Sequence, residues 1–82
     1  MPTVYTLGAN RIMIRTNDHP PPHVHVIGPD KQASFWLHCP NGPVELRENY
    51  NFSTKELQAI EDSLNSRLSE ACDKWGEIHG PH

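Results

Sequence analysis

The sequence lacks any long apolar run. No segment approaches the roughly 18 to 20 apolar residues that a membrane-spanning helix needs. The first residues, MPTVYTLGANR, contain neither the basic stretch nor the apolar stretch of a secretory signal peptide. These absences predict a cytoplasmic protein that does not bind membranes.

Cysteine is scarce, because the 82 residues include only Cys39 and Cys72. The two thiols could pair, but neither belongs to a CxxC motif, and a chain without a secretory signal is expected in a reducing compartment. We therefore expect both cysteines to be reduced.

Positive charge is also in short supply, since 7 basic residues face 10 acidic ones and the net charge is −3. An excess of negative charge opposes general affinity for nucleic acids. RNA is therefore a less favoured partner than a protein.

Hydrophobic periodicity predicts an α+β fold in a single domain, residues 1–82. Apolar and polar residues alternate in the first half, which indicates strands over 3–7, 11–15, 23–27, 32–37 and 43–47. We expect a small antiparallel sheet of four or five strands. A single long C-terminal helix over 54–75 would cover one face, and a flexible tail would follow over 77–82.

The start of this helix is marked by Ser53 and Glu56, which form the S-x-x-E pattern of a capping box. Gly76 is expected to end it. One apolar stripe follows the helix at intervals of three or four residues: Leu57, Ile60, Leu64, Leu68, Ala71 and Trp75. The stripe should pack on the sheet.

The segment NDHPPPHVHV, residues 17–26, is the candidate functional site. Side chains alternate along a strand, so His23 and His25 should share the face opposite to Val24 and Val26. If the valines meet the helix, the two imidazoles stand on an open face. The same alternation adds five residues to that face: Arg11, Met13, Arg15, Ser34 and Trp36.

The three prolines stiffen the approach to this strand, because each fixes its own backbone and lacks an N–H donor. A rigid turn could bring His19 back towards His23 and His25. These three histidines are candidate ligands for zinc or another transition-metal ion, with Asp18 or His79 as further candidates. Asn17 and Asp18 could instead orient a ring nitrogen. A solvated histidine face without metal is the alternative.

The string NDHPPPHVHV resembles the hallmark NDHxPPHVHV of a bacterial family, the domain of unknown function 4160. The likeness continues through MPTV, GANRIMIRT, ASFWL, PVEL, NFSTKEL and WGEIHG. The family motif falls on Asn17, Asp18, His19, Pro21, Pro22, His23 and His25. The chain departs from the family at HCPNG, which lengthens the approach to PVEL, and at Asn51, where glycine is common; asparagine tolerates the same left-handed turn.

The resemblance implies a partner but no reaction, since members of this family often look like one half of a two-gene, toxin–antitoxin-like module. A small protein encoded by a neighbouring gene would then be the partner, and a homodimer is the alternative. Arg11, Arg15 and Trp36 are the expected partner-binding residues, because arginine and tryptophan dominate interface energetics.

Two other functions stay open at this point. One is binding of a transition metal by the histidine cluster. The other is a metal-independent ribonuclease, in which His23 and His25 act as acid and base while Arg15 or Arg11 stabilises the charged phosphorane. Whether the protein is an enzyme is left undecided by the sequence.

Overall fold

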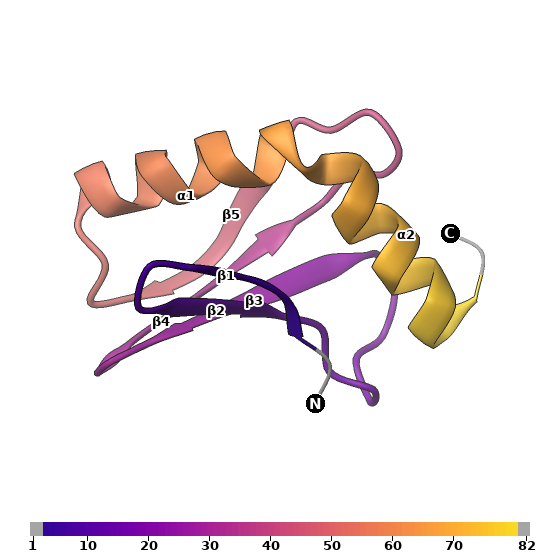
Figure 1. Ribbon diagram of the computed structural model, residues 1–82, viewed down its shortest axis with the longest axis horizontal. Helices are drawn as coiled ribbons and strands as arrows, with labels where there is room; N and C mark the ends of the chain where they lie inside the picture. The colour runs from indigo at the N-terminus through magenta and orange to yellow at the C-terminus, as the bar shows by residue number, and fades with distance from the viewer. Residues whose placement is uncertain (1–2, 81–82) are drawn as a thin grey trace.

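The computed structural model describes residues 3–80 (Figure 1). The elements along the chain are β1 (Thr3–Leu7), β2 (Asn10–Met13), β3 (His23–Gly28), β4 (Lys31–Trp36), β5 (Glu45–Tyr50), α1 (Thr54–Ser66) and α2 (Leu68–His79). The predicted α+β class is confirmed. No helix within the described residues is both long enough and apolar enough to cross a membrane.

The strands form one five-stranded sheet in the order β1-β2-β3-β4-β5, and each neighbouring pair is antiparallel. Every strand therefore pairs with the next strand in the sequence. This arrangement leaves β3 in the middle, with β1 and β5 at the edges. Asn51, directly after β5, has a φ of 71°, so the left-handed turn expected there is present.

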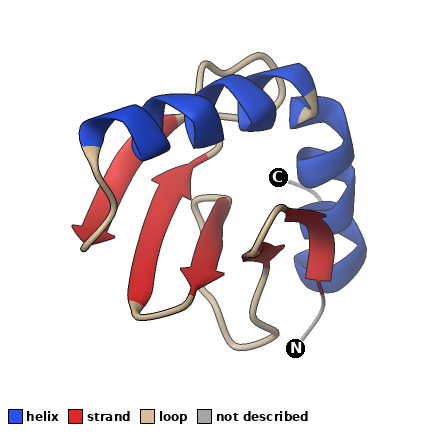
Figure 2. Cartoon of the chain, turned by 60° about the vertical axis from the view of Figure 1, so that its left-hand side comes forward, coloured by secondary structure: helices blue, strands red, loops and turns tan. Residues whose placement is uncertain are grey.

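The prediction of a single helix is wrong, because the helical part is divided at Arg67. The backbone of Arg67 leaves the helical region (φ −118°, ψ 25°), and α2 bends down beside the sheet while α1 lies above it (Figures 1 and 2). The apolar stripe did not reveal this bend, since it continues across the break with Leu64 and Leu68 both buried.

The predicted helix end is also wrong, because α2 passes through Gly76 and continues to His79. Glycine inside a helix costs only about 1 kcal/mol relative to alanine, which packing of α2 can offset. Residues 77–79 of the expected flexible tail are therefore helical. Gly80 caps the end of α2, and residues 81–82, which include His82, lie outside the described residues.

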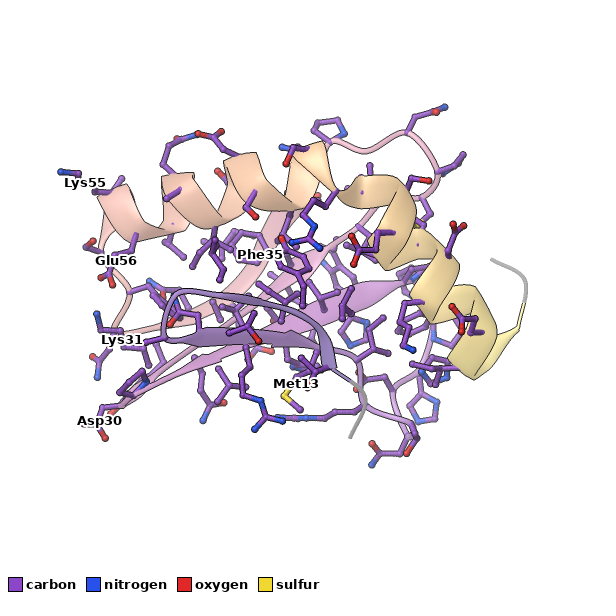
Figure 3. All side chains as sticks on the ribbon, in the orientation of Figure 1. Met13, Asp30, Lys31, Phe35, Lys55 and Glu56 are labelled. Carbon is purple, nitrogen blue, oxygen red and sulfur yellow. A yellow bond between two sulfur atoms is a disulfide. The ribbon has the colours of Figure 1, made fainter. Side chains whose placement is uncertain are left out.

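The core lies between the sheet and the helices, where Phe35 points towards α1 in Figure 3. The capping box of Ser53 and Glu56 is present at the start of α1. The strands bury Tyr5, Ile12, Ile14, Val24, Val26, Ala33, Phe35 and Leu37. The helices bury Ile60, Leu64, Leu68, Ala71, Cys72 and Trp75. The expected apolar stripe thus packs on the sheet.

Cys39 and Cys72 form a disulfide, so the expectation of two reduced cysteines is wrong. Their Cα atoms lie 5.9 Å apart, within the usual range for a disulfide. The missing signal peptide and the missing CxxC motif do not indicate which distant residues the fold brings together. The bond ties the loop after β4 to α2.

The face of the sheet that points away from the helices, here called the outer face, is less open than expected. Met13, His23 and Ser34 are directed to this side, as predicted, but only 2%, 5% and 3% of their surfaces are exposed. Met13 lies opposite His25, which lies opposite Ser34. Side chains directly opposite on neighbouring strands are only about 5 Å apart and cover one another.

Candidate functional site

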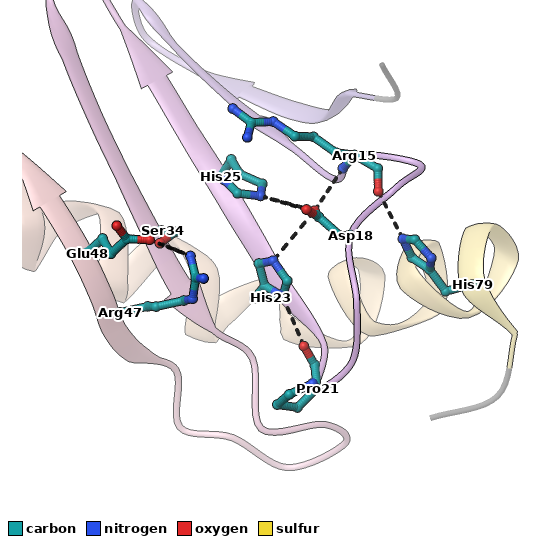
Figure 4. Close-up of polar contacts among 9 residues, drawn as sticks. All are labelled: Arg15, Asp18, Pro21, His23, His25, Ser34, Arg47, Glu48 and His79. Carbon is teal, nitrogen blue, oxygen red and sulfur yellow. Dashed lines mark hydrogen bonds and ion pairs between the residues drawn. The ribbon is translucent and has the colours of Figure 1, made fainter.

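The site is a cluster of Asp18, His23 and His25 on the outer face, where the β2–β3 connection meets β3 (Figure 4). One oxygen of the carboxylate and one nitrogen of each ring lie within 4.8 Å of one another. The Oδ2 atom of Asp18 is 3.0 Å from Nε2 of His25 and 3.6 Å from Nε2 of His23. All three side chains converge on one point.

Asp18 points inward because a tight turn holds it. Its carboxylate accepts a hydrogen bond from the backbone N–H of Arg15 at 3.1 Å, and its own N–H donates to the Arg15 carbonyl at 3.2 Å. The same carbonyl accepts a hydrogen bond from His79 Nε2 at 2.9 Å. The end of α2 therefore fastens the turn that carries Asp18.

His23 is the buried member of the cluster, with 5% of its surface exposed. Its ring centroid lies 5.5 Å from that of Trp36 and 5.4 Å from that of Trp75, so β4 and α2 both pack against it. Its Nδ1 atom donates to the carbonyl of Pro21 at 2.9 Å. In the neutral ring this fixes the proton on Nδ1 and leaves the lone pair of Nε2 facing Asp18.

His25 is partly exposed and contacts both oxygens of Asp18, at 3.0 and 3.3 Å from its Nε2 atom. The pKa of His25 lies below its ordinary value of 6.5, because burial disfavours the charged ring. The attraction of Asp18 opposes this shift without cancelling it, and the positive charge of Arg15 adds to it. His25 is therefore a neutral imidazole near pH 7.

Asp18 stays ionised although it is largely covered. Burial raises the pKa of its carboxyl group, but the hydrogen bond from the Arg15 backbone and the attraction of His25 and His23 in their protonated forms together outweigh that effect. The net pKa of Asp18 lies below its ordinary value of 3.8. The cluster thus combines one carboxylate with two imidazoles, which is a ligand set suited to a transition metal.

The cluster opens into a pocket of about 440 Å³ on the outer face. Arg15 lines one side of this pocket, while Arg47 and Tyr50 from β5 line another. The sequence reasoning did not assign Arg47 to the site. A β-bulge between β4 and β5 turns it outward: Ser34 pairs with Glu48 and Phe35 with Leu46, so Arg47 is the extra residue. No local sequence pattern signals that bulge.

His19 does not lie in the cluster, so the structure does not bring the three predicted ligands His19, His23 and His25 together. Its side chain is exposed, whereas the adjacent Asp18 turns inward through its bonds to Arg15. Asp18 supplies the third group instead. His79 does fold back towards the site, as the sequence suggested, but it bonds the Arg15 carbonyl rather than joining the cluster.

The three expected partner-binding residues have different surroundings. Arg11 is exposed and hydrogen-bonds Thr3 at 3.3 Å, outside the pocket lining. Arg15 lines the pocket, as noted. Trp36 is half-buried, with the guanidinium of Arg47 5.1 Å from its ring centroid. The outer face therefore brings Arg15 near the histidines and keeps Arg11 apart from them.

A comparison with protein families matches residues 10–76 to one family. The chain belongs to this family, which is described as Domain of unknown function (DUF4160). The resemblance seen in the histidine motif is thereby confirmed. Comparisons with curated proteins and with solved structures found no match.

Proposed function

We propose that the protein binds a divalent transition-metal ion, with zinc as the first candidate, through Asp18, His23 and His25. The histidine cluster expected from the sequence is retained in this proposal, with Asp18 in the place of His19. Binding of a cognate partner protein is a separate prediction, and it concerns the wider outer face.

The observation that carries the proposal is the orientation of the His23 ring. Its Nδ1 atom is committed to the Pro21 carbonyl, and its Nε2 lone pair points at the carboxylate of Asp18, 3.6 Å away. With the His23 ring neutral, this lone pair and the carboxylate are two electron-rich groups that face each other in a buried position, and a metal ion between them would stabilise the arrangement. Histidines that bind metals usually donate their other ring N–H to a carbonyl or carboxylate, as His23 does.

The distances also suit a metal. A tetrahedral zinc ion bonded at about 2.0 to 2.1 Å separates its ligand atoms by about 3.3 Å. The two nitrogen–oxygen distances, 3.0 and 3.6 Å, lie on either side of that value. The three donor atoms lie within 4.8 Å of one another, so the side chains must move closer together to surround one ion.

Three protein ligands would leave at least one coordination position free. Closed structural zinc sites use four protein ligands, whereas three are typical of sites at which the metal also binds water or a substrate. The pocket beside the cluster gives that position an approach from solvent. We therefore infer a metal that takes part in ligand binding rather than one that only supports the fold.

The metal-independent ribonuclease has less support from this geometry. An acid and a base that act on one phosphodiester must both reach the substrate. His23 is almost fully buried, and its two ring nitrogens face Pro21 and Asp18. The ribonuclease remains a prediction. It would be supported if the protein cleaved single-stranded RNA in EDTA and His23→Ala abolished that cleavage.

Zinc titration of the metal-free protein by calorimetry tests the proposal. We expect one ion per chain, with Asp18→Asn and His25→Ala each weakening binding by about tenfold or more, because each removes a ligand. His19→Ala and His38→Ala serve as matched controls, because both are exposed histidines outside the cluster, and they should leave the affinity unchanged. Equal losses in the controls, or no binding by the parent protein, would refute it.

A further inference from the structure

We propose that the pocket beside the cluster binds a phosphate-type oxyanion, with Arg15 and Arg47 holding its oxygens against the free position of the bound metal. The inference rests on the proposed metal site and adds the chemical class of its ligand. Neither arginine is a metal ligand, so the two proposals can fail separately.

Arg47 is positioned in advance for this role. Its guanidinium lies over the Trp36 ring, 5.1 Å from the centroid, and its Nη1 atom donates to Ser34 Oγ at 3.3 Å. Ser34 is directly opposite His25 in the β3–β4 pairing. The bulge in β5 thus directs Arg47 to the same part of the outer face as the cluster. A guanidinium held in this way loses little freedom when it binds an anion.

Arg15 approaches the cluster from the other side, at the start of the β2–β3 connection (Figure 4). It lines the same pocket as Asp18 and His25. Within residues 3–80 the Arg15 side chain forms no ion pair. It therefore has an uncompensated positive charge at the pocket wall.

The pocket also contains negative charge, which the ligand must overcome. A metal ion would neutralise Asp18. Glu48 contacts Arg47 Nη1 at 2.5 Å, but 71% of its side chain is exposed, so it can rotate into solvent when an anion takes its place. Glu48 is thus a competitor for the same guanidinium. Its removal should strengthen anion binding.

The size of the pocket favours a phosphate ester over inorganic phosphate alone. Its volume of about 440 Å³ lies in the range of roughly 300 to 1,000 Å³ that small-molecule sites occupy. Tyr50 lines it with 64% of its surface exposed, which offers a free aromatic face to a ring carried by the ester. Inorganic phosphate and a phosphate ester share the oxyanion that the two arginines would bind, and the ester adds contacts at Tyr50.

Calorimetric titration with adenosine monophosphate, inorganic phosphate and adenosine tests the inference, using both metal-free and zinc-loaded protein. We expect adenosine monophosphate to bind and adenosine not to bind. Arg15→Gln and Arg47→Gln should each weaken binding by about tenfold, as expected for loss of a charge-assisted hydrogen bond. Arg11→Gln is the matched control and should leave binding unchanged, and Glu48→Gln should tighten it.

The outcomes separate the two proposals. Binding by metal-free protein that depends on Arg15 and Arg47 supports the oxyanion site even if zinc does not bind. Zinc binding with no effect of these arginines on the phosphate compounds overturns it and leaves the metal site intact. Tighter binding of the nucleotide than of phosphate, lost in Tyr50→Ala, identifies an aromatic ester as the ligand; equal affinities identify the oxyanion alone.

Discussion

His23 and His25 are separated by one residue and point to the same face, yet their surroundings differ. Strand alternation in the sequence was sufficient to predict their common face. It could not predict burial, because the cover over His23 comes from Trp36 and from Trp75, which is distant in the chain. The expectation that both histidines are exposed is therefore wrong, because His23 is buried and only 12% of the His25 side chain is exposed.

This difference predicts unequal costs of substitution in the metal-free protein. His23→Ala should lower the free energy of unfolding by about 2 kcal/mol or more, because it empties a packed space and removes the bond to Pro21. His25→Ala should cost less, about 1 kcal/mol, because Trp36 and Trp75 pack against the ring of His23. Urea denaturation measures both. Equal costs would show that the two rings are covered to the same degree.

The sequence was also insufficient to predict which of Asp18 and His19 turns inward. The motif NDHPPPHVHV indicated where the site lies, and the structure places a three-residue cluster there. Which of two adjacent side chains turns inward depends on the turn that Arg15 closes, and the residue types alone do not specify it. Arg47 was missed for a similar reason, since only the strand pairing shows the bulge.

At the scale of elements, the apolar stripe and the capping box predicted where the helical part begins and which side it buries. The break at Arg67 was not predictable from them, because Leu64 and Leu68 keep the helical spacing across it. The bend nevertheless bears on the site. It directs α2 so that Trp75 reaches His23 and His79 reaches the Arg15 carbonyl.

The packing of α1 on the sheet predicts a large effect of Leu64→Ala. Leu64 has no exposed surface, so this substitution should lower the free energy of unfolding by about 2 to 5 kcal/mol. Leu57→Ala on the same helix is the matched control, because Leu57 is only partly buried and should cost less. Chemical denaturation compares the two, and a near-neutral Leu64→Ala would contradict the core described above.

The contact between β4 and α1 predicts a pH effect far from the site. Lys31 and Glu56 lie at the same end of the molecule (Figure 3), with Nζ 2.6 Å from Oε2. The bond from Lys31, followed by the one from the Ser53 backbone, lowers the pKa of Glu56 to about 2 from an ordinary 4.5. A lowered pKa in the folded state means that this contribution to stability is complete above pH 4.5 and is lost as the pH falls through about 2.

NMR titration of the Glu56 carboxyl group measures this shift directly. Lys31→Gln should return the pKa most of the way to its ordinary value, because the largest cause is removed. Lys55→Gln, which changes the exposed lysine beside Glu56 in the sequence, should have little effect. A Glu56 pKa that stays near 4.5 in the parent protein would rule out the ion pair.

At the scale of the whole molecule, the antiparallel sheet was predictable because each strand pairs with the next strand in the sequence. The helical cover was predictable from the apolar stripe. The Cys39–Cys72 bond was not predictable from the sequence, because its partners are 33 residues apart and the position of α2 beside the loop after β4 brings them together. The cluster lies on the face of the sheet away from α1, while α2 reaches it through Trp75 and His79. Most of the core and the candidate site therefore occupy opposite faces, and α2 connects them.

This separation gives the partner hypothesis a definite test. If a small protein encoded by a neighbouring gene binds the outer face, amide hydrogen exchange should slow in β2, β3 and β4 when the partner is added, and α1 should be unchanged. Trp36→Ala should weaken association by about 2 kcal/mol or more. The same protection without any added protein, increasing with concentration, would indicate a homodimer. Protection confined to α1 would place the partner on the other side.

The central claim, that Asp18, His23 and His25 bind one metal ion, is tested most directly by NMR of the imidazole nitrogens. On addition of one equivalent of zinc, the Nε2 signals of His23 and His25 should move to metal-bound positions. Nδ1 of His23 should stay protonated, and the proton of His25 should move from Nε2 to Nδ1, because the metal takes the nitrogen that now faces Asp18. Unchanged Nε2 signals in these two rings, or shifts only in His19 or His38, would contradict the account.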